Sequence, residues 1–241
     1  MLHPKLRAFA DKIRDERLRK KVVELLENPT IEIDGERYSG LPLEVSPAGL
    51  SHHHCYPGGY LEHVVSTCNL ALALCKSVEK VYHGKVDRDI VLAGILLHDV
   101  FKPSTYVVNE DGSYGSTSLA ECLDHLSLAV SELVRRGFPL EVVHAVCAHH
   151  GDYGPMRPHT VEALICHLAD FMDSRLNGKA LRAAVYLSKR AVGEEIRGLT
   201  SKEAFEILYS KKSEGWEGVA KTVEKIMRRR GRESDKNRTK R

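Results

Sequence analysis

The chain has 241 residues, of which 42% are hydrophobic and 29% are charged, and its formal net charge is +3. This length can bury the core of one domain, and the hydrophobic share excludes a fully disordered chain. No apolar run approaches the roughly 20 residues that a membrane-spanning helix needs. The N-terminal segment is charged throughout without an apolar stretch, and the six cysteines show no close pairing. We therefore expect a cytoplasmic protein with reduced thiols and no membrane partner.

Charge is uneven along the sequence. The segment 228–241, RRRGRESDKNRTKR, holds eight basic and two acidic residues, so it carries +6 and the rest of the chain sums to −3. It has no apolar periodicity, and we expect a disordered tail. Such a tail is compatible with binding RNA or single-stranded DNA, although we favour a purely solubilising role.

The spacing of apolar residues predicts an all-α fold with two small β-hairpins. A helical pattern covers about 3–27 and stops at Asn28-Pro29, and Asp-Gly turns predict hairpins within 31–38 and 104–116. Further helices are predicted over about 60–83, 88–101, 118–136, 139–150, 161–176, 179–191, 201–211 and 216–229. The helix over 88–101 is apolar nearly all round, so we expect it at the centre.

Four regions follow from this pattern. They are a helix and hairpin packed on the core (1–50), a metal-binding core (51–178), C-terminal helices of the same domain (179–227) and the basic tail (228–241).

The 13 histidines are the unusual feature of the composition, and all except His3 lie between His52 and His167. Such a concentration suggests a metal or proton-transfer site. His98-Asp99 lies in the apolar segment LLHDVFKP, where two polar groups are costly to bury without compensation. A bound metal provides that compensation, and so does a hydrogen-bonded core histidine beside a helix-end aspartate.

Neighbouring predicted helices each offer further metal-type ligands. These are His63, His125, the pair His149-His150, and Asp170. Imidazole and carboxylate groups without thiolate suit one or two divalent ions such as Fe, Mn, Co, Ni or Zn. The supply exceeds what one catalytic metal requires, which favours a two-metal site.

The order of these ligands resembles the HD superfamily of metal-dependent phosphohydrolases over about 52–176. The segment HDVFK is similar to that family's HD-x-x-K pattern, with Phe101 where glycine is usual. The segments HHHCYPGGYLEHV, LAGILLHDVFKP, HHGDYGPMRP and HLADFMDSRL resemble the HD domain of bacterial 3′→5′ exoribonucleases. Those enzymes carry an additional OB-fold domain, which segment 1–50 is too short and too helical to supply. A second resemblance, at the level of superfamily and size, is to compact archaeal-type HD phosphodiesterases acting on cyclic phosphates of small molecules.

The resemblance implies roles for individual residues. One metal would be held by His63, His98, Asp99 and Asp170. Asp99 would bridge to a second metal held by His125 and by His149 or His150, of which we favour His149. Lys102 would bind phosphate or protonate the leaving oxygen, although it also fits a helix-end lysine that interacts with the helix dipole. His54 and Arg157, in loops beside the motif, are candidate phosphate or substrate contacts, and a surface His run without a role is an equal alternative for His54.

These observations predict a metal-dependent phosphohydrolase, foremost a phosphodiesterase acting on a nucleotide or a cyclic-phosphate small molecule. The alternatives are a 3′→5′ exonuclease on RNA or single-stranded DNA and a regulatory module that binds a nucleotide without hydrolysing it. The substrate class implies a small phosphorylated partner, and the sequence leaves a homo-oligomer open.

Overall fold

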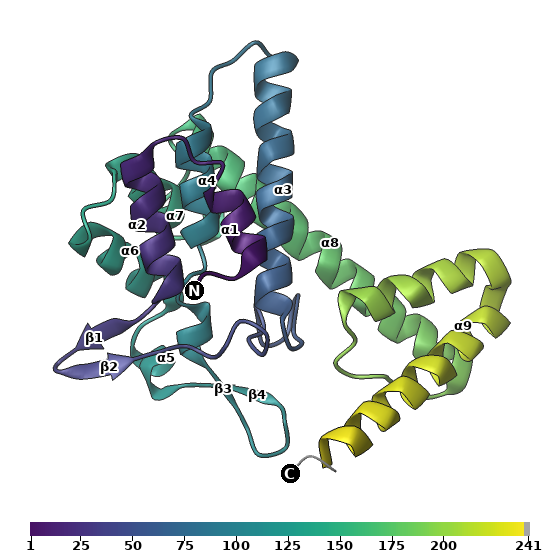
Figure 1. Cartoon of the computed structure of the whole chain (residues 1–241). Coiled ribbons are helices and arrows are strands. Elements are labelled where there is room, and N and C mark those ends of the chain that lie inside the picture. The colour runs from purple at the N-terminus through teal and green to yellow at the C-terminus, as the bar shows by residue number, and fades with distance from the viewer. Residues whose placement is uncertain (239–241) are drawn as a thin grey trace.

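Helices dominate the computed structural model, which describes residues 1–238 (Figure 1). The α-helices are α1 (Pro4–Ala10), α2 (Glu16–Glu27), α3 (Gly59–Lys80), α4 (Arg88–Leu97), α5 (Ser118–Cys122), α6 (His125–Arg135), α7 (Leu140–Cys147), α8 (Val161–Val192) and α9 (Ser201–Arg238). The strands are β1 (Ile31–Ile33), β2 (Glu36–Tyr38), β3 (Tyr106–Val108) and β4 (Tyr114–Ser116), and short 3₁₀ turns are η1 (Lys102–Thr105) and η2 (Gly151–Tyr153). The predicted all-α class is confirmed.

Both predicted hairpins are present. β1 pairs antiparallel with β2, and β3 pairs antiparallel with β4. The first turn holds Asp34 at φ 53° and Gly35 at φ 80°, the left-handed geometry that a type I′ turn requires at both central positions.

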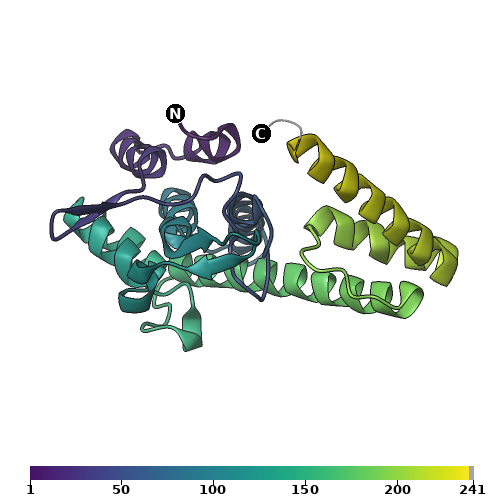
Figure 2. The same cartoon turned by 90° about the horizontal axis from the view of Figure 1, so that it is seen from below.

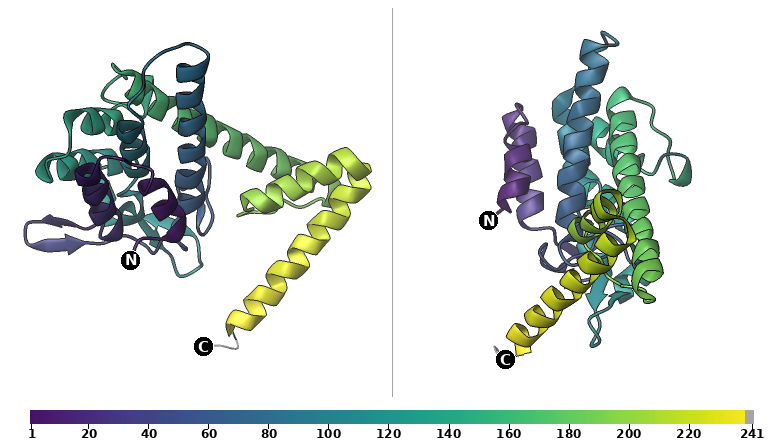
Figure 3. Two further views of the ribbon diagram at one scale, coloured as in Figure 1. Left: turned by 45° about the horizontal axis from the view of Figure 1, so that its top comes forward. Right: turned by 90° about the vertical axis from the view of Figure 1, so that its right-hand side faces the viewer.

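The centre of the core is α4. Every residue from Val91 to Leu97 is buried, and α4 contacts α3, α7 and α8 as well as α1 and α2. In the right-hand view of Figure 3, α1 and α2 lie on one side of α3 and α8 lies on the other. The close approach of α4 to α7 depends on Gly94, because a Cβ there would lie 2.9 Å from Ala145 Cβ. An apolar helix with neighbours on all sides is what its sequence predicts.

Two predicted helices are each divided by a capping aspartate. The 3–27 segment is split because the Asp15 carboxylate accepts hydrogen bonds from the backbone N–H groups of Arg17 and Leu18 and so begins α2. The 118–136 segment is split in the same way, because Asp124 accepts from Ser127 N at 2.6 Å and begins α6. The predicted 88–101 helix is also too long: α4 ends at Leu97, ahead of Pro103, which cannot continue an α-helix.

The predicted break at Asn177-Gly178 is wrong, since α8 runs without interruption through it. The Asn177 side chain accepts from His54 N at 2.7 Å and donates to Ser201 Oγ at 2.6 Å. Gly178 permits a close chain approach, because a Cβ there would lie 2.7 Å from His52 O. Asn177 and Gly178 thus make tertiary contacts to residues outside the helix and do not end it. The expected region boundary at 178 therefore falls inside α8.

The C-terminal half of α8 and α9 form an arm that projects from the core (Figures 1 and 2). The arm has its own apolar cluster of buried residues: Ala184, Ile196, Leu199, Ala204, Ile207, Val219, Val223 and Ile226. Gly215, at φ 70°, breaks α9 between the two predicted helices. Helix continues over 228–238, where the sequence predicts a disordered tail, and residues 239–241 of that tail lie outside the described residues. Arg229 and Arg230, near the start of this segment, form ion pairs with Glu203 and so attach it to the first part of α9.

The Glu203 ion pairs predict a pH-dependent contribution to stability. Burial opposes ionisation of Glu203, but hydrogen bonds from Arg230 and the Thr200 backbone outweigh it and lower its pKa to about 2. A depressed folded-state pKa stabilises the fold above the unfolded-state value and is lost as pH falls through the folded-state value. We expect Glu203→Gln to lower the free energy of unfolding by about 2 kcal/mol at pH 7, with the difference from wild type shrinking between pH 4.5 and pH 2.

The measurement is urea unfolding followed by circular dichroism across this pH range. Glu217→Gln is the matched control, because Glu217 forms an exposed pair with Lys221 on the same helix and should change stability by less than about 0.5 kcal/mol. A Glu203→Gln effect that does not vary with pH would contradict the ion-pair explanation.

No helix in residues 1–238 is both long and apolar enough to cross a membrane.

Candidate metal centre

Five helical segments bring the predicted ligands to one place in the core. His63 lies early in α3, His98 and Asp99 directly follow α4, and His125 begins α6. His149 follows the end of α7, and Asp170 lies in α8. His63 and His149 are 86 positions apart in sequence, yet the side chains converge because α3, α7 and α8 pack against α4 while α6 packs against α7 and η1.

The first ligand group consists of His63, His98 and Asp170, with one oxygen of Asp99. His63 Nε2 lies 3.2 Å from both His98 Nε2 and Asp170 Oδ1. Asp99 Oδ2 lies 3.4 Å from His63 Nε2 and 3.3 Å from His98 Nε2. Ligands about 2.1 Å from one metal are separated from each other by about 3 to 3.5 Å, so these spacings fit a single coordinated ion.

The second group gathers around the other oxygen of the same carboxylate. Asp99 Oδ1 lies 3.3 Å from His125 Nε2 and 3.7 Å from His149 Nε2. His150 is half-buried beside them, and one ring nitrogen from each of the three histidines falls within 4.8 Å of the others. The two oxygens of Asp99 therefore face two separate groups of imidazoles.

Hydrogen bonds set the tautomers of three of these histidines. His98 Nδ1 lies 2.7 Å from Ile95 O, and His149 Nδ1 lies 2.7 Å from Val146 O. A carbonyl oxygen only accepts, so each Nδ1 carries the proton, and a neutral ring then presents a bare Nε2. His63 Nδ1 makes the corresponding bond, at 2.7 Å, to Asp173 Oδ2. All three Nε2 atoms face Asp99, and in the neutral form of each ring Nε2 offers the lone pair that a metal requires.

Several buried polar atoms at this centre lack partners. Within the described part of the chain, Asp99 Oδ1, His125 Nε2 and His149 Nε2 are buried without a hydrogen bond. Leaving such groups unpaired costs about 1–3 kcal/mol each, and more for a charged group. A bound cation would satisfy all of them, and nitrogen and oxygen donors without thiolate fit a borderline divalent metal.

The protonation states of Asp99 and His149 also suit metal binding. Burial tends to raise the pKa of Asp99, but His98 and Lys102 outweigh it and lower this pKa well below its usual range. Burial lowers the pKa of His149 well below its usual value. The carboxylate is thus ionised and His149 is neutral, which are the forms that bind a metal.

At His63, burial is outweighed by hydrogen bonds to Asp170 and Asp173, which raise its pKa well above the usual value. A metal that binds there therefore displaces a proton.

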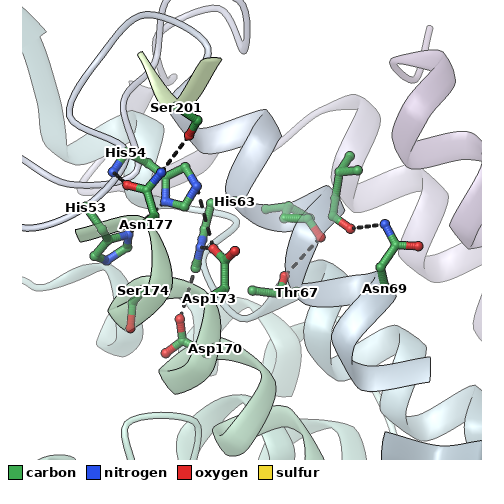
Figure 4. Close-up of polar contacts among 12 residues, drawn as sticks. His53, His54, His63, Thr67, Asn69, Asp170, Asp173, Ser174, Asn177 and Ser201 are labelled. Carbon is green, nitrogen blue, oxygen red and sulfur yellow. Dashed lines mark hydrogen bonds and ion pairs between the residues drawn. The ribbon is translucent and has the colours of Figure 1, made fainter. Parts of the chain in front are cut away.

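The three predicted substrate contacts lie in different surroundings. Lys102 Nζ is 2.7 Å from Asp99 Oδ2 and mostly buried, so it borders the ligand cluster. His54 is only 2% exposed, and its Nε2 lies 3.6 Å from Asp173 Oδ2, on the far side of His63 from Asp170 (Figure 4). Arg157 is exposed and pairs with Asp152 at 2.9 Å on the surface. Lys102 therefore lies at the ligand cluster, whereas His54 is buried beside Asp173, on the other side of His63 from Asp170.

Asp173 is a residue that the sequence analysis did not assign. It lies one turn after Asp170 on α8, and both carboxylates meet the His63 ring (Figure 4). The signal in the sequence was the i, i+3 spacing within ADFMD, which places two acids on one helix face. Nothing local distinguished Asp173 from a solvent-exposed acid.

The chain is similar to a known family over the region that holds this centre. The HD domain family matches residues 60–174. The chain is 45% identical over 174 residues to a dihydroneopterin 2′,3′-cyclic phosphate phosphodiesterase of Methanocaldococcus jannaschii, covering 72% of this chain and 70% of that protein. It is 34% identical over 144 residues to the 3′-5′ exoribonuclease YhaM of Bacillus licheniformis and 37% identical to that of Listeria monocytogenes. Those alignments cover 54% of this chain but only 43% of each exoribonuclease.

No solved structure gives a significant match to the chain. The family match nevertheless covers the five segments that carry the clustered histidines and aspartates, and the 45%-identical relative is aligned over 72% of this chain. The chain therefore belongs to the HD-domain family of phosphohydrolases, as the order of these residues predicts.

Proposed function

We propose that this protein is a phosphodiesterase that opens the cyclic phosphate of a small molecule in a two-metal site. The observation that carries the two-metal proposal is the placement of Asp99, whose two oxygens face two imidazole groups at 3.3–3.7 Å. The relative that is 45% identical is named for a 2′,3′-cyclic phosphate substrate, which supports this substrate class.

The ligand assignment follows the two groups. His63, His98, Asp99 and Asp170 are proposed to hold one divalent transition metal, and Asp99, His125 and His149 to hold the second. When bound, such ions polarise phosphate oxygens and generate a nucleophilic hydroxide from water near neutral pH.

Lys102 is proposed to act on the phosphate and its leaving oxygen. Burial opposes its charge, but the carboxylates of Asp99 and Asp170 outweigh burial and raise the pKa of Lys102. Its ammonium group therefore stays protonated beside the ligand cluster. When water attacks phosphorus and one ester P–O bond breaks, the ring opens to a phosphomonoester, and the departing alkoxide needs a proton that Lys102 Nζ can donate.

The experiment is a substrate panel with metal-reconstituted protein. The panel contains dihydroneopterin 2′,3′-cyclic phosphate, a nucleoside 2′,3′-cyclic phosphate, a nucleoside 3′,5′-cyclic phosphate and a short single-stranded RNA. We expect kcat/KM for the 2′,3′-cyclic esters to exceed that for RNA by at least about tenfold, a factor equal to about 1.4 kcal/mol of differential transition-state binding. Chelator-treated protein, expected to be inactive and to recover with added metal, is the control.

Two other outcomes identify the alternative functions. Shortening of RNA from its 3′ end with the cyclic esters untouched would favour the exoribonuclease function, for which the basic segment 228–241 supplies a candidate RNA contact. Tight binding of a nucleotide without turnover by metal-loaded protein would favour a regulatory module.

A further inference from the structure

A second layer of polar side chains lies behind His63, on the side away from Asp99. Asp173 is 3% exposed, and its Oδ2 accepts a hydrogen bond from His63 Nδ1 at 2.7 Å. Figure 4 shows Asp173 beside the His63 ring, while Asp170 meets the ring at its other nitrogen. The two aspartates therefore contact opposite ends of one imidazole.

The two ring nitrogens of His63 have different roles. His63 Nε2 lies 3.2 Å from Asp170 Oδ1, within the proposed metal group. A metal binds this nitrogen only when it is free of its proton, and the hydrogen bond at Nδ1 decides which nitrogen is free. A buried acceptor at Nδ1 thus holds one ring proton there, so that Nε2 is the nitrogen left free once a metal has displaced the other proton.

The position of Asp173 is itself fixed by tertiary contacts. His54 Nε2 approaches the same Oδ2 at 3.6 Å, and His54 N donates to Asn177 Oδ1 at 2.7 Å. Asn177 Nδ2 in turn donates to the Oγ of Ser201, the first residue of α9. A network therefore links the base of the C-terminal arm to a proposed metal ligand.

The loop that carries His54 packs closely against the start of α3. His54 has a left-handed φ of 47°, and a Cβ at Gly59 would clash with the backbone oxygen of His54. Glycine at this position allows the loop to fold against the start of α3, which holds the His54 ring above Asp173.

We propose that Asp173 is a positioning residue of the metal centre: it holds His63 in the tautomer and orientation that present Nε2 to the metal, without touching metal or substrate itself. This inference rests on the proposed metal site. Loss of a carboxylate that supports a ligating histidine typically costs 10–100-fold in metal affinity.

The test measures metal affinity by competition with a chromogenic chelator, alongside the melting temperature of the metal-free protein. We expect Asp173→Ala to weaken binding of Mn²⁺ or Zn²⁺ by about 10–100-fold. Asp173→Asn keeps an acceptor oxygen of the same shape and should lose less than about tenfold, so it serves as the conservative variant and guards against misfolding of the alanine variant. Asp11→Ala, at an exposed carboxylate on the end of α1, is the control and should bind as wild type does.

A double-mutant cycle separates positioning from a general structural role. If Asp173 acts through His63, then adding Asp173→Ala to His63→Ala should cause no further loss of affinity. If Asp173→Ala lowered metal affinity by the same factor in the wild-type and His63→Ala proteins, the inference would be overturned. It would also be overturned if Asp173→Ala bound metal within about twofold of wild type while His63→Ala bound it weakly. Wild-type affinity and activity in His63→Ala would instead overturn the proposed metal site, and with it this inference.

Discussion

Asp99→Asn is expected to reduce hydrolysis of a phosphodiester by more than about 100-fold, because supporting residues alone cost 10–100-fold. The substitution keeps the shape of the side chain but removes its charge and replaces one oxygen with an amide NH₂ group, which donates instead of accepting. Both oxygens of Asp99 face imidazole groups, so one of the two proposed metals loses a ligand whichever way the amide turns. The measurements are kcat/KM on an aryl phosphodiester and metal content by elemental analysis.

Circular dichroism distinguishes this loss from unfolding. Asp99 pairs with the mostly buried ammonium of Lys102 at 2.7 Å and its pKa lies well below its usual range, so Asp99→Asn should lower the melting temperature of the metal-free protein. A circular dichroism spectrum like that of the wild type at the assay temperature shows that the variant is still folded when its activity is measured. Asp11→Asn is the control for removing a carboxylate. If Asp99→Asn retained more than about a tenth of wild-type activity, a loss smaller than that of a supporting residue, the bridging role would be wrong.

The second large effect is expected at His149, and its neighbour provides the matched control. His149 is fully enclosed, its Nδ1 donates to Val146 O, and its Nε2 lies 3.7 Å from Asp99 Oδ1. His150 is half-buried, with its ring centroid 3.9 Å from that of His149. We expect His149→Ala to lose the second metal and more than about 100-fold in kcat/KM, whereas His150→Ala should lose tenfold or less, as an outer residue does.

The check is metal stoichiometry and kinetics for both variants at matched metal concentration. The reverse order of effects would assign the second site to His150 and leave the phosphodiesterase function intact. Equal losses in the two variants would mean that both imidazoles bind the metal.

The arrangement of the centre explains why these effects should be large. Most of the ligands come from α4 or from helices packed against it, and residues Val91 to Leu97 of α4 are all buried. Close packing leaves little freedom for a neighbouring side chain to replace a lost ligand. The same packing excludes water from His98, Asp99 and His149, which strengthens their interaction with a bound cation.

Helix type, hairpins and family could be predicted from the sequence because each depends on short-range patterns. The Asp34-Gly35 turn requires left-handed backbone geometry at two adjacent residues, and the apolar surface of α4 requires burial on all sides. The chemical identity of the ligands is equally local. Histidine and aspartate in the observed order, with His98-Asp99 inside an apolar segment, indicate a metal site before any fold is known.

Local patterns were misleading where a residue serves a distant contact. Asn177-Gly178 has the composition of a helix end, yet α8 continues because Asn177 bonds to His54 and Gly178 makes room for His52 O. Asp15 and Asp124 read as ordinary polar residues within long helices, but both cap new ones. His54 belongs to a run of histidines for which the sequence predicts a substrate contact, and local sequence did not indicate that its side chain is only 2% exposed.

The chemistry available to this protein was thus determined by its sequence alone: the set of imidazole and carboxylate groups, their order along helices, and a charge of +6 confined to the C-terminal segment. Only the tertiary structure decided which oxygen of Asp99 faces which histidines, which nitrogen of each ring carries its proton, and that Asp173 supports His63. The physical reason is distance along the chain. His63 and Asp173 are 110 residues apart, and a hydrogen bond between them exists only once α3 and α8 have packed together.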